Sequence, residues 1–234
     1  MQRQRRKARS ATDVTSIDHC VTCNRVMKPD RLPKWESLVS KLLQFAEEEP
    51  PIEIFVLKCH LIIESVMYSF LSHRLGMQER HLPTLQFFPL AKLALGGTEH
   101  SLALTKALAL NDPRNAFSHE LDDLGLERDY EKLAVRERLY WPNEVDIGER
   151  SAIRRIRVRA IRTACLIAVV NVWAPIIRNH LAKRPDLSDE ERDRLLSGIE
   201  LQRRNVENLR EKHAELQAVV DQGRRALQGP PPTT

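Results

Sequence analysis

The chain has 234 residues, enough for one well-filled hydrophobic core, and 42% of them are hydrophobic. Aromatic residues make up only 5% and there are only 8 glycines, which disfavours an all-β fold, and no unbroken apolar run approaches the ~20 residues that cross a bilayer. Of the net charge of +5, residues 1–34 carry +6, from nine Lys and Arg against three acids. We therefore expect a cytoplasmic, all-α protein without membrane contact, whose positive charge is concentrated in its N-terminal arm.

The first 33 residues are predicted to form this arm, which is basic and disordered. It lacks the apolar core of a secretory signal, and its charge suits either an electrostatic contact with nucleic acid or a solvated tail. His19, Cys20 and Cys23 supply three possible zinc ligands, whereas a closed zinc site has four. The two thiols are therefore either idle or part of a site completed across a dimer, and we expect no bound metal or other cofactor.

A helical domain is predicted for residues 34–184. Its central helix is the strongly apolar segment 52–75, which lies between Pro51 and Gly76. A helix rich in spaced apolar residues precedes it, and two shorter helices are expected at 84–95 and 98–110.

Within the central helix, His60 and Glu64 are four residues apart and therefore lie on one face. Either they form a buried structural pair, or they reach a functional site. The structural pair is the commoner outcome for such spacing.

The stretch "LNDPRNAFSHEL" at residues 110–121 carries the chemistry. Asn111 or Asp112 is a suitable helix cap and Pro113 suits a first helical position, so we predict that Arg114 lies in the first turn of a new helix. Backbone N–H groups and an arginine would together bind phosphate there, and His119 would exchange a proton near neutral pH.

The spacing of these residues leaves one copy of the site incomplete. Arg114 and His119 are about 140° apart around a helix, whereas Asn115 and His119 share a face. Two copies packed across this helix would pool two arginines and two histidines in one cleft.

Two further segments are predicted to be helical in the rest of the domain, one around residues 127–139 and one long helix over 149–184. The long helix begins with an arginine stripe at positions i, i+4 and i+7, formed by Arg155, Arg159 and Arg162. Such a stripe either follows an RNA backbone or is a solvated helix face.

Residues 186–228 form the last predicted helix, which begins with a capping box of Ser188 and Glu191. A spacing alternating between four and three residues then runs from Leu195 to Leu227, and seven of its ten positions are apolar. This pattern predicts a coiled coil and favours a homodimer. The alternative is that the helix packs antiparallel against the body of the same chain. Residues 229–234 are predicted to be a disordered tail.

The motif "DPRNAFSHEL" resembles the Arg-Asn-x-x-x-His signature of the HEPN superfamily, whose members are α-helical and include many metal-independent ribonucleases. The preceding segments "FVLKCHLIIESVMYSFLSHRL" and "FFPLAKLALGG" are similar to the helices that lead to that motif, so the resemblance covers roughly residues 34–180.

The resemblance implies a HEPN-like bundle that cleaves RNA through the RNA's own 2′-hydroxyl, at a site shared between two protomers. By position, Arg114 would stabilise the scissile phosphate, His119 would transfer a proton, and Asn115 would orient the site. It also implies a bacterial toxin or phage-defence effector, with RNA as substrate and a cognate antitoxin or other regulatory protein as a possible partner.

The same residues also resemble the mannitol operon repressor family, which shares this helical layout and turn. That resemblance implies a non-catalytic transcriptional regulator or interaction module. Both readings predict the same fold, so they differ only in whether Arg114 and His119 perform chemistry.

Overall fold

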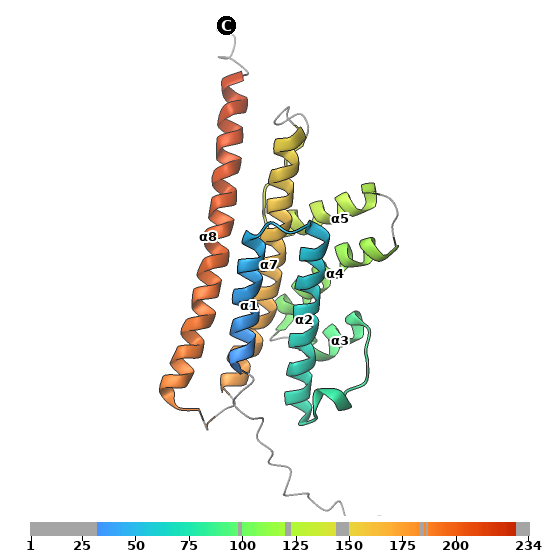
Figure 1. The fold of residues 1–234 in the computed structure, drawn as a ribbon, viewed down its shortest axis with the longest axis vertical. Coiled ribbons are helices and arrows are strands. Elements are labelled where there is room, and N and C mark those ends of the chain that lie inside the picture. Colours follow the sequence, from blue (N-terminus) through green and yellow to red (C-terminus); the bar gives the residue numbers. More distant parts are fainter. Residues whose placement is uncertain are drawn as a thin grey trace, which may run out of the picture.

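The computed structural model describes residues 32–97, 100–119, 123–143, 150–182, 185 and 187–227. These residues form seven α-helices, one short 3-10 helix and no strand, which confirms the all-α fold class. The elements in chain order are α1 (Leu32–Glu47), α2 (Ile52–Leu75), η2 (Glu79–His81), α3 (Phe87–Leu95), α4 (Ser101–His119), α5 (Asp123–Arg136), α7 (Arg150–Ala182) and α8 (Asp189–Leu227). Figure 1 shows α2 and α7 at the centre, with α1 and α8 on one side and α3, α4 and α5 on the other.

The central helix α2 has the bounds predicted from its flanking residues. Pro51 precedes it, and Gly76 ends it with a φ of 63°, in the left-handed region that glycine enters without a Cβ clash. The N–H of Met77 then donates to the carbonyl of Ser72 across 3.0 Å, which satisfies one of the last carbonyls of the helix.

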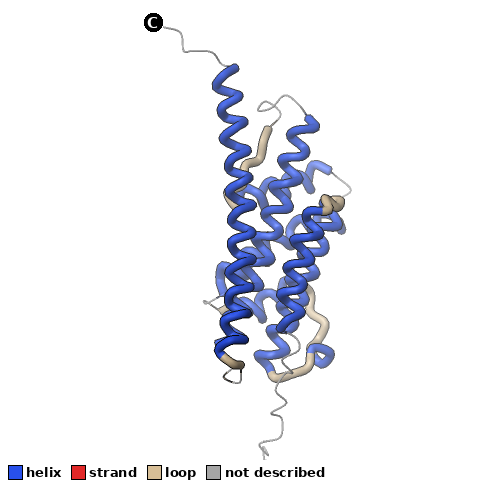
Figure 2. The backbone as a smooth tube through the Cα atoms, turned by 60° about the vertical axis from the view of Figure 1, so that its left-hand side comes forward, coloured by secondary structure: helices blue, strands red, loops and turns tan. Residues whose placement is uncertain are grey.

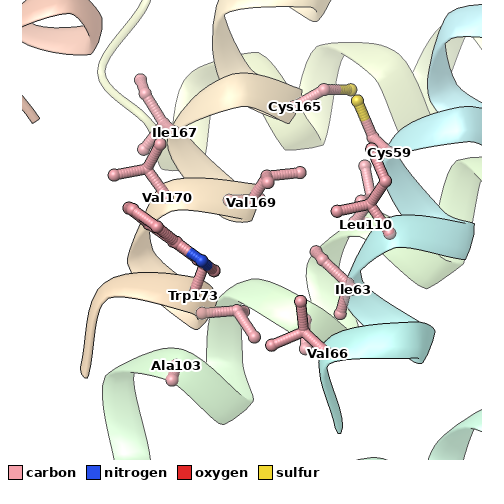
Figure 3. Packing of buried hydrophobic residues seen from close by; sticks show 14 of the residues in the cluster. Cys59, Ile63, Val66, Ala103, Leu110, Cys165, Ile167, Val169, Val170 and Trp173 are labelled. Atoms are coloured by element: carbon pink, nitrogen blue, oxygen red, sulfur yellow. The ribbon is translucent and has the colours of Figure 1, made fainter. Parts of the chain in front are cut away.

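The core lies where α2, α4 and α7 meet. Figure 3 shows Trp173 of α7 among aliphatic side chains, and Ala103 of α4 close by. Small residues such as Ala164 and Ala168 are fully buried in α7, which lets neighbouring backbones approach. Cys59 and Cys165 are buried free thiols whose sulfurs point toward each other across the α2–α7 contact.

Both central helices are long and apolar enough to cross a membrane by length and composition, although neither is an unbroken apolar run. The most apolar window of α2 is 61% buried and that of α7 is 83% buried inside the bundle. Core helices of soluble proteins pass the same test, so the two helices are weak evidence for a membrane location.

Helix α8 begins with the predicted capping box. The backbone N–H of Glu191 donates to Ser188 Oγ across 3.2 Å, and the backbone N–H of Ser188 donates to Glu191 Oε2 across 3.2 Å. Two orphan donors at the helix start are thereby satisfied.

The predicted coiled-coil seam is buried against the same chain, so the antiparallel alternative describes α8 better than a self-pairing coiled coil. Figures 1 and 2 show α8 running alongside α7 in the opposite direction, with its last turns extending past the first turn of α7. Ile199 and Val206 are buried, Gln202 Nε2 donates to Ser40 Oγ of α1 across 3.3 Å, and His213 Nε2 lies 2.9 Å from the Tyr140 carbonyl. Most of the seam is therefore not free to form a dimer.

A buried carboxylate connects α8 to the rest of the bundle. The side chain of Glu137, which follows α5, is only 1% exposed and forms an ion pair with Lys106 of α4. Its second oxygen lies 3.6 Å from a guanidinium nitrogen of Arg210 on α8. One carboxylate thus holds together the start of α4, the end of α5 and the middle of α8.

We expect Ser188→Ala to lower the free energy of unfolding by about 1 kcal/mol, because it removes the side-chain cap of α8. Urea unfolding followed by circular dichroism measures the change. Ser197→Ala is the matched control, since Ser197 is exposed in the interior of the same helix. Alanine is the better helix former there, so the control should be neutral or slightly stabilising, and equal losses in both variants would contradict the capping role.

Candidate functional site

The motif residues lie at the end of α4, not at the start of a new helix as predicted. Helix α4 runs without interruption from Ser101 to His119, with Pro113 inside it. Neither Asn111 nor Asp112 is therefore a helix cap, and Arg114 is in the last two turns. The end of a helix presents carbonyl oxygens and a partial negative charge, so the expected phosphate-binding N–H groups are not available to Arg114.

The helix continues through Pro113 because packing of the turn that precedes the proline outweighs its cost. A proline inside a helix removes one backbone hydrogen bond and costs about 3 kcal/mol. Ala109 and Leu110 are 3% and 0% exposed, and α4 contacts α2, α3, α5 and α7. The surrounding helices hold this segment in helical form, a tertiary effect that local sequence signals do not contain.

The register of α4 places Asn111 against α2, where it contacts His60. His60 Nε2 lies 3.1 Å from Asn111 Oδ1, and the imidazole is only 2% exposed. The Phe87 ring of α3 covers the imidazole at a centroid distance of 4.1 Å. His60 therefore joins three helices at one point.

His60 is neutral at physiological pH. Its pKa is lowered from 6.5 to about 4, chiefly by burial; the hydrogen bond to Asn111 acts in the opposite direction, and the charge of Arg114 contributes to the lowering. Because Asn111 Oδ1 only accepts, Nε2 carries the proton and Nδ1 keeps its lone pair. Glu64 Oε2 lies 4.0 Å from Nδ1, which is too long for a hydrogen bond.

Arg114 and Asn115 lie beside this buried contact and are half-exposed. Arg114 Nη1 donates to Asn115 Oδ1 across 3.1 Å, and the charge of Arg114 acts on His60. The Glu64 side chain is 30% exposed. We refer to His60, Glu64, Asn111, Arg114 and Asn115 as the α2–α4 cluster.

The predicted secondary candidates His60 and Glu64 thus belong to the same cluster as Arg114 and Asn115. Asn111 is the member that the sequence analysis assigned to another role, as a helix cap. Its spacing identifies it, because Asn111 lies four residues before Asn115 and the two share one face of the helix once the helix is known to be continuous.

His119 is the last residue of α4, and its side chain lies outside the described residues. The helical register places position 119 on the same face as positions 111 and 115. It also keeps Arg114 and His119 about 140° apart around the helix, so a single copy does not place both residues on one face, as predicted from their spacing.

The predicted arginine stripe on α7 is divided between different environments. Arg155 and Arg159 are exposed. Burial lowers the pKa of His213 on α8, and the charge of the nearby Arg159 adds to that lowering. Arg162 instead donates to the Pro50 carbonyl and lies 3.9 Å from a carboxylate oxygen of Glu49, so it holds the α1–α2 connection. None of these contacts reaches the α2–α4 cluster.

Comparison of the chain with protein-family models, curated proteins and solved structures finds no match. The resemblance to the HEPN superfamily therefore rests on the residues quoted above. Among the described residues, no group of three or more His, Cys, Asp or Glu side chains is arranged to hold a metal ion. The zinc-ligand candidates His19, Cys20 and Cys23 lie outside the described residues.

Acid should destabilise the protein through His60. Between pH 6.5 and about 4 the unfolded chain takes up a proton on this residue and the folded chain does not, so the free energy of unfolding falls as the pH falls through this window. The full effect is about 3 kcal/mol, and above this window the contribution is constant. Melting temperature measured at half-unit pH steps tests the expectation.

The matched variant is His60→Gln, whose amide does not titrate. Carboxylates and His213 also titrate on the acid side, so the informative quantity is the difference in slope between the parent and this variant. His60→Gln should give a flatter dependence of the melting temperature on pH. Parallel curves would show that His60 does not differ in protonation between the two states.

Proposed function

We propose that the chain is a metal-independent endoribonuclease of the HEPN type, with Arg114, Asn115 and His119 as its active residues. The observation that carries the proposal is the α2–α4 cluster. It holds a half-exposed arginine and an amide at the end of α4, next to a buried neutral histidine. A guanidinium held in this way can bind two phosphate oxygens at once.

In this proposal the RNA supplies its own nucleophile. The 2′-hydroxyl oxygen attacks the adjacent phosphorus, and the bond to the 5′-oxygen breaks, leaving a 2′,3′-cyclic phosphate. Arg114 stabilises the negative charge that develops on the non-bridging oxygens, and His119 transfers a proton to or from the reacting oxygens. Asn115, hydrogen-bonded to Arg114, fixes the direction of the guanidinium fork.

His60 acts as a positioning residue in this scheme. Its Nδ1 is buried, so it does not meet a substrate, whereas its bond to Asn111 holds the end of α4 against α2. Glu64, which is partly exposed beside it, extends the polar surface toward solvent.

We further propose that two copies complete the site. With most of the α8 seam buried within the chain, the surface that favours a second copy is an apolar stripe on α2. Ile54, Leu57 and Leu61 are 53%, 47% and 54% exposed, and the stripe continues in register to Glu64 of the α2–α4 cluster. Pairing along this stripe would bury apolar area and bring two clusters together. Sedimentation of the full chain at micromolar concentration distinguishes a dimer from a 27.0 kDa monomer.

The direct test is incubation of the purified full chain with total RNA in EDTA, followed by analysis of the fragment ends. We expect cleavage that persists in EDTA and leaves 2′,3′-cyclic phosphates. Fragments with 3′-hydroxyl ends, or cleavage only with added divalent ions, would point to a different chemistry.

The second candidate is a non-catalytic regulator or interaction module. The observation that favours it is the same apolar α2 stripe, because exposed apolar patches mark protein-binding surfaces. This candidate predicts no RNA cleavage and a partner or nucleic-acid affinity that survives loss of Arg114 and His119.

A further inference from the structure

A pocket away from the α2–α4 cluster lies between the start of α2, α5 and the first half of α7. Its volume is about 350 Å³, and it is lined by residues that the proposed ribonuclease chemistry does not use. Ligand pockets in proteins begin at roughly 300 Å³, so this space accommodates a small organic molecule.

The inner wall of the pocket is apolar. It is formed by aliphatic side chains from α2 and α7 together with Trp141, namely Ile52, Ile153, Val158 and Ile161. Ile153 and Ile161 are 5% and 3% exposed, so they are fixed in the core, whereas Trp141 is only partly buried.

One edge of the pocket is positively charged. Arg150, Arg154 and Arg157 follow one another at i, i+4 and i+7 on α7, and all three line the pocket. Arg157 forms an ion pair with Glu127, donates from Nε to the Pro142 carbonyl across 2.9 Å, and lies 5.1 Å from the centroid of the Trp141 ring. Its charge is therefore balanced and its position is fixed.

Arg150 and Arg154 differ from Arg157 in that both are exposed and neither pairs with a carboxylate among the described residues. The edge of the pocket thus has two cationic side chains in excess of the Arg157–Glu127 pair. An apolar wall next to this cationic edge matches a molecule that has an apolar body and one anionic group.

We propose that this pocket binds a small amphiphilic anion, with its carboxylate or similar acidic group at Arg150 and Arg154 and its apolar body against Trp141, Ile153 and Val158. The apolar wall selects the body by burial, and the arginine pair selects the charge. The site is independent of the proposed ribonuclease activity, because it shares no residue with the α2–α4 cluster.

The experiment uses the full chain and anilinonaphthalene sulfonate, a fluorescent anion with an aromatic body. Three compounds are tested as competitors of the probe. Decanoate carries both the apolar body and the acidic group, decan-1-ol carries the body alone, and acetate carries the acidic group alone. We expect decanoate to displace the probe at a concentration at least about tenfold lower than decan-1-ol, as a charge-assisted hydrogen bond implies, and acetate not to displace it.

Variants assign the binding to this pocket. The double variant Arg150→Ala with Arg154→Ala should weaken decanoate at least about tenfold and leave decan-1-ol unchanged. Arg155→Ala is the matched control, since Arg155 is exposed on the same helix but does not line the pocket. Val158→Phe keeps the arginines and fills the space, so it should abolish binding of the probe itself.

Three outcomes would overturn the proposal. They are equal binding of decanoate and decan-1-ol, a double arginine variant that behaves as the parent does, and a Val158→Phe variant that still binds. The last outcome would place the probe on another apolar surface, such as the α2 stripe.

Discussion

Arg114→Ala should reduce RNA cleavage by at least about a hundredfold while leaving the melting temperature nearly unchanged. Loss of one preorganised donor to a developing oxyanion typically costs a factor of about 10²–10³. The side chain is half-exposed, so its removal should change the free energy of unfolding by no more than about 1 kcal/mol. Initial rates on a defined RNA, measured beside a thermal melt, give both quantities.

The controls separate a phosphate-binding role from a general charge effect. Arg128→Ala removes an exposed arginine of α5 and should cleave RNA as the parent does. Arg114→Lys keeps the charge without the planar fork and should give an intermediate rate. His119→Ala should lose activity to a similar extent, whereas His81→Ala, which removes an exposed histidine of η2, should not.

Two results would reject the ribonuclease proposal. One is an Arg114→Ala variant that cleaves RNA at the rate of the parent. The other is a parent protein that cleaves no RNA while nucleic-acid or partner binding persists in His119→Ala, which is the outcome that a regulator predicts.

The largest expected loss of stability comes from Glu137→Ala, at about 3 kcal/mol or more. The substitution leaves Lys106, whose side chain is only 16% exposed, without the carboxylate that pairs with it, and breaking one side of a buried pair costs about 3–5 kcal/mol. It also removes a contact between α8 and the body, so unfolding by urea should begin at a lower concentration.

The matched control for this substitution is Glu207→Ala. Glu207 pairs with the same Arg210 at 3.1 Å, but its side chain is 54% exposed, so its removal should cost about 0.5 kcal/mol or less. In the double variant Glu137→Met with Lys106→Met no unpaired charge remains, and most of the stability should return. Equal effects of Glu137→Ala and Glu207→Ala would show that burial does not strengthen the Glu137 contact.

The parts of the fold that could be predicted from the sequence are those with local causes. Pro51 and Gly76 bound the central helix. Pro51 has no backbone N–H, so the helix does not extend through it toward the N-terminus, and Gly76 ends the helix because it adopts a left-handed backbone conformation. The capping box at Ser188 is a contact within four residues, so the sequence contains all of it.

The partner of α8 and the continuity of α4 could not be predicted from local signals. A seam with a 3.5-residue period fits another copy and a neighbouring helix of the same chain equally well, and Gln202 pairs with Ser40, which is 162 residues away. Local rules favour a break at Pro113, and only the helices packed around α4 reverse that preference.

Only part of the candidate site could be predicted, because local signals identify residues but not the contacts between distant helices. Arg114, Asn115 and His119 came from a motif, and His60 and Glu64 from their spacing on the central helix. The contact between His60 and Asn111 spans 51 residues and depends on how α2 and α4 pack together. The electrostatic environment of Arg114 also differs from the prediction, because the residue lies near the end of a helix and not at its start.

The position of α1 between α2, α7 and α8 sets an order for folding during synthesis. Its anchors lie far along the chain, since Arg162 and Gln202 contact Pro50 and Ser40 across 112 and 162 residues. A ribosome releases α2 soon after α1, so Phe45 can stack on Phe55 early, but it must release most of the chain before the α7 and α8 sides of the α1 contact exist. Contacts of such long sequence separation slow folding, so α1 stays only partly covered for most of synthesis, and chaperones can bind its remaining apolar surface in that interval.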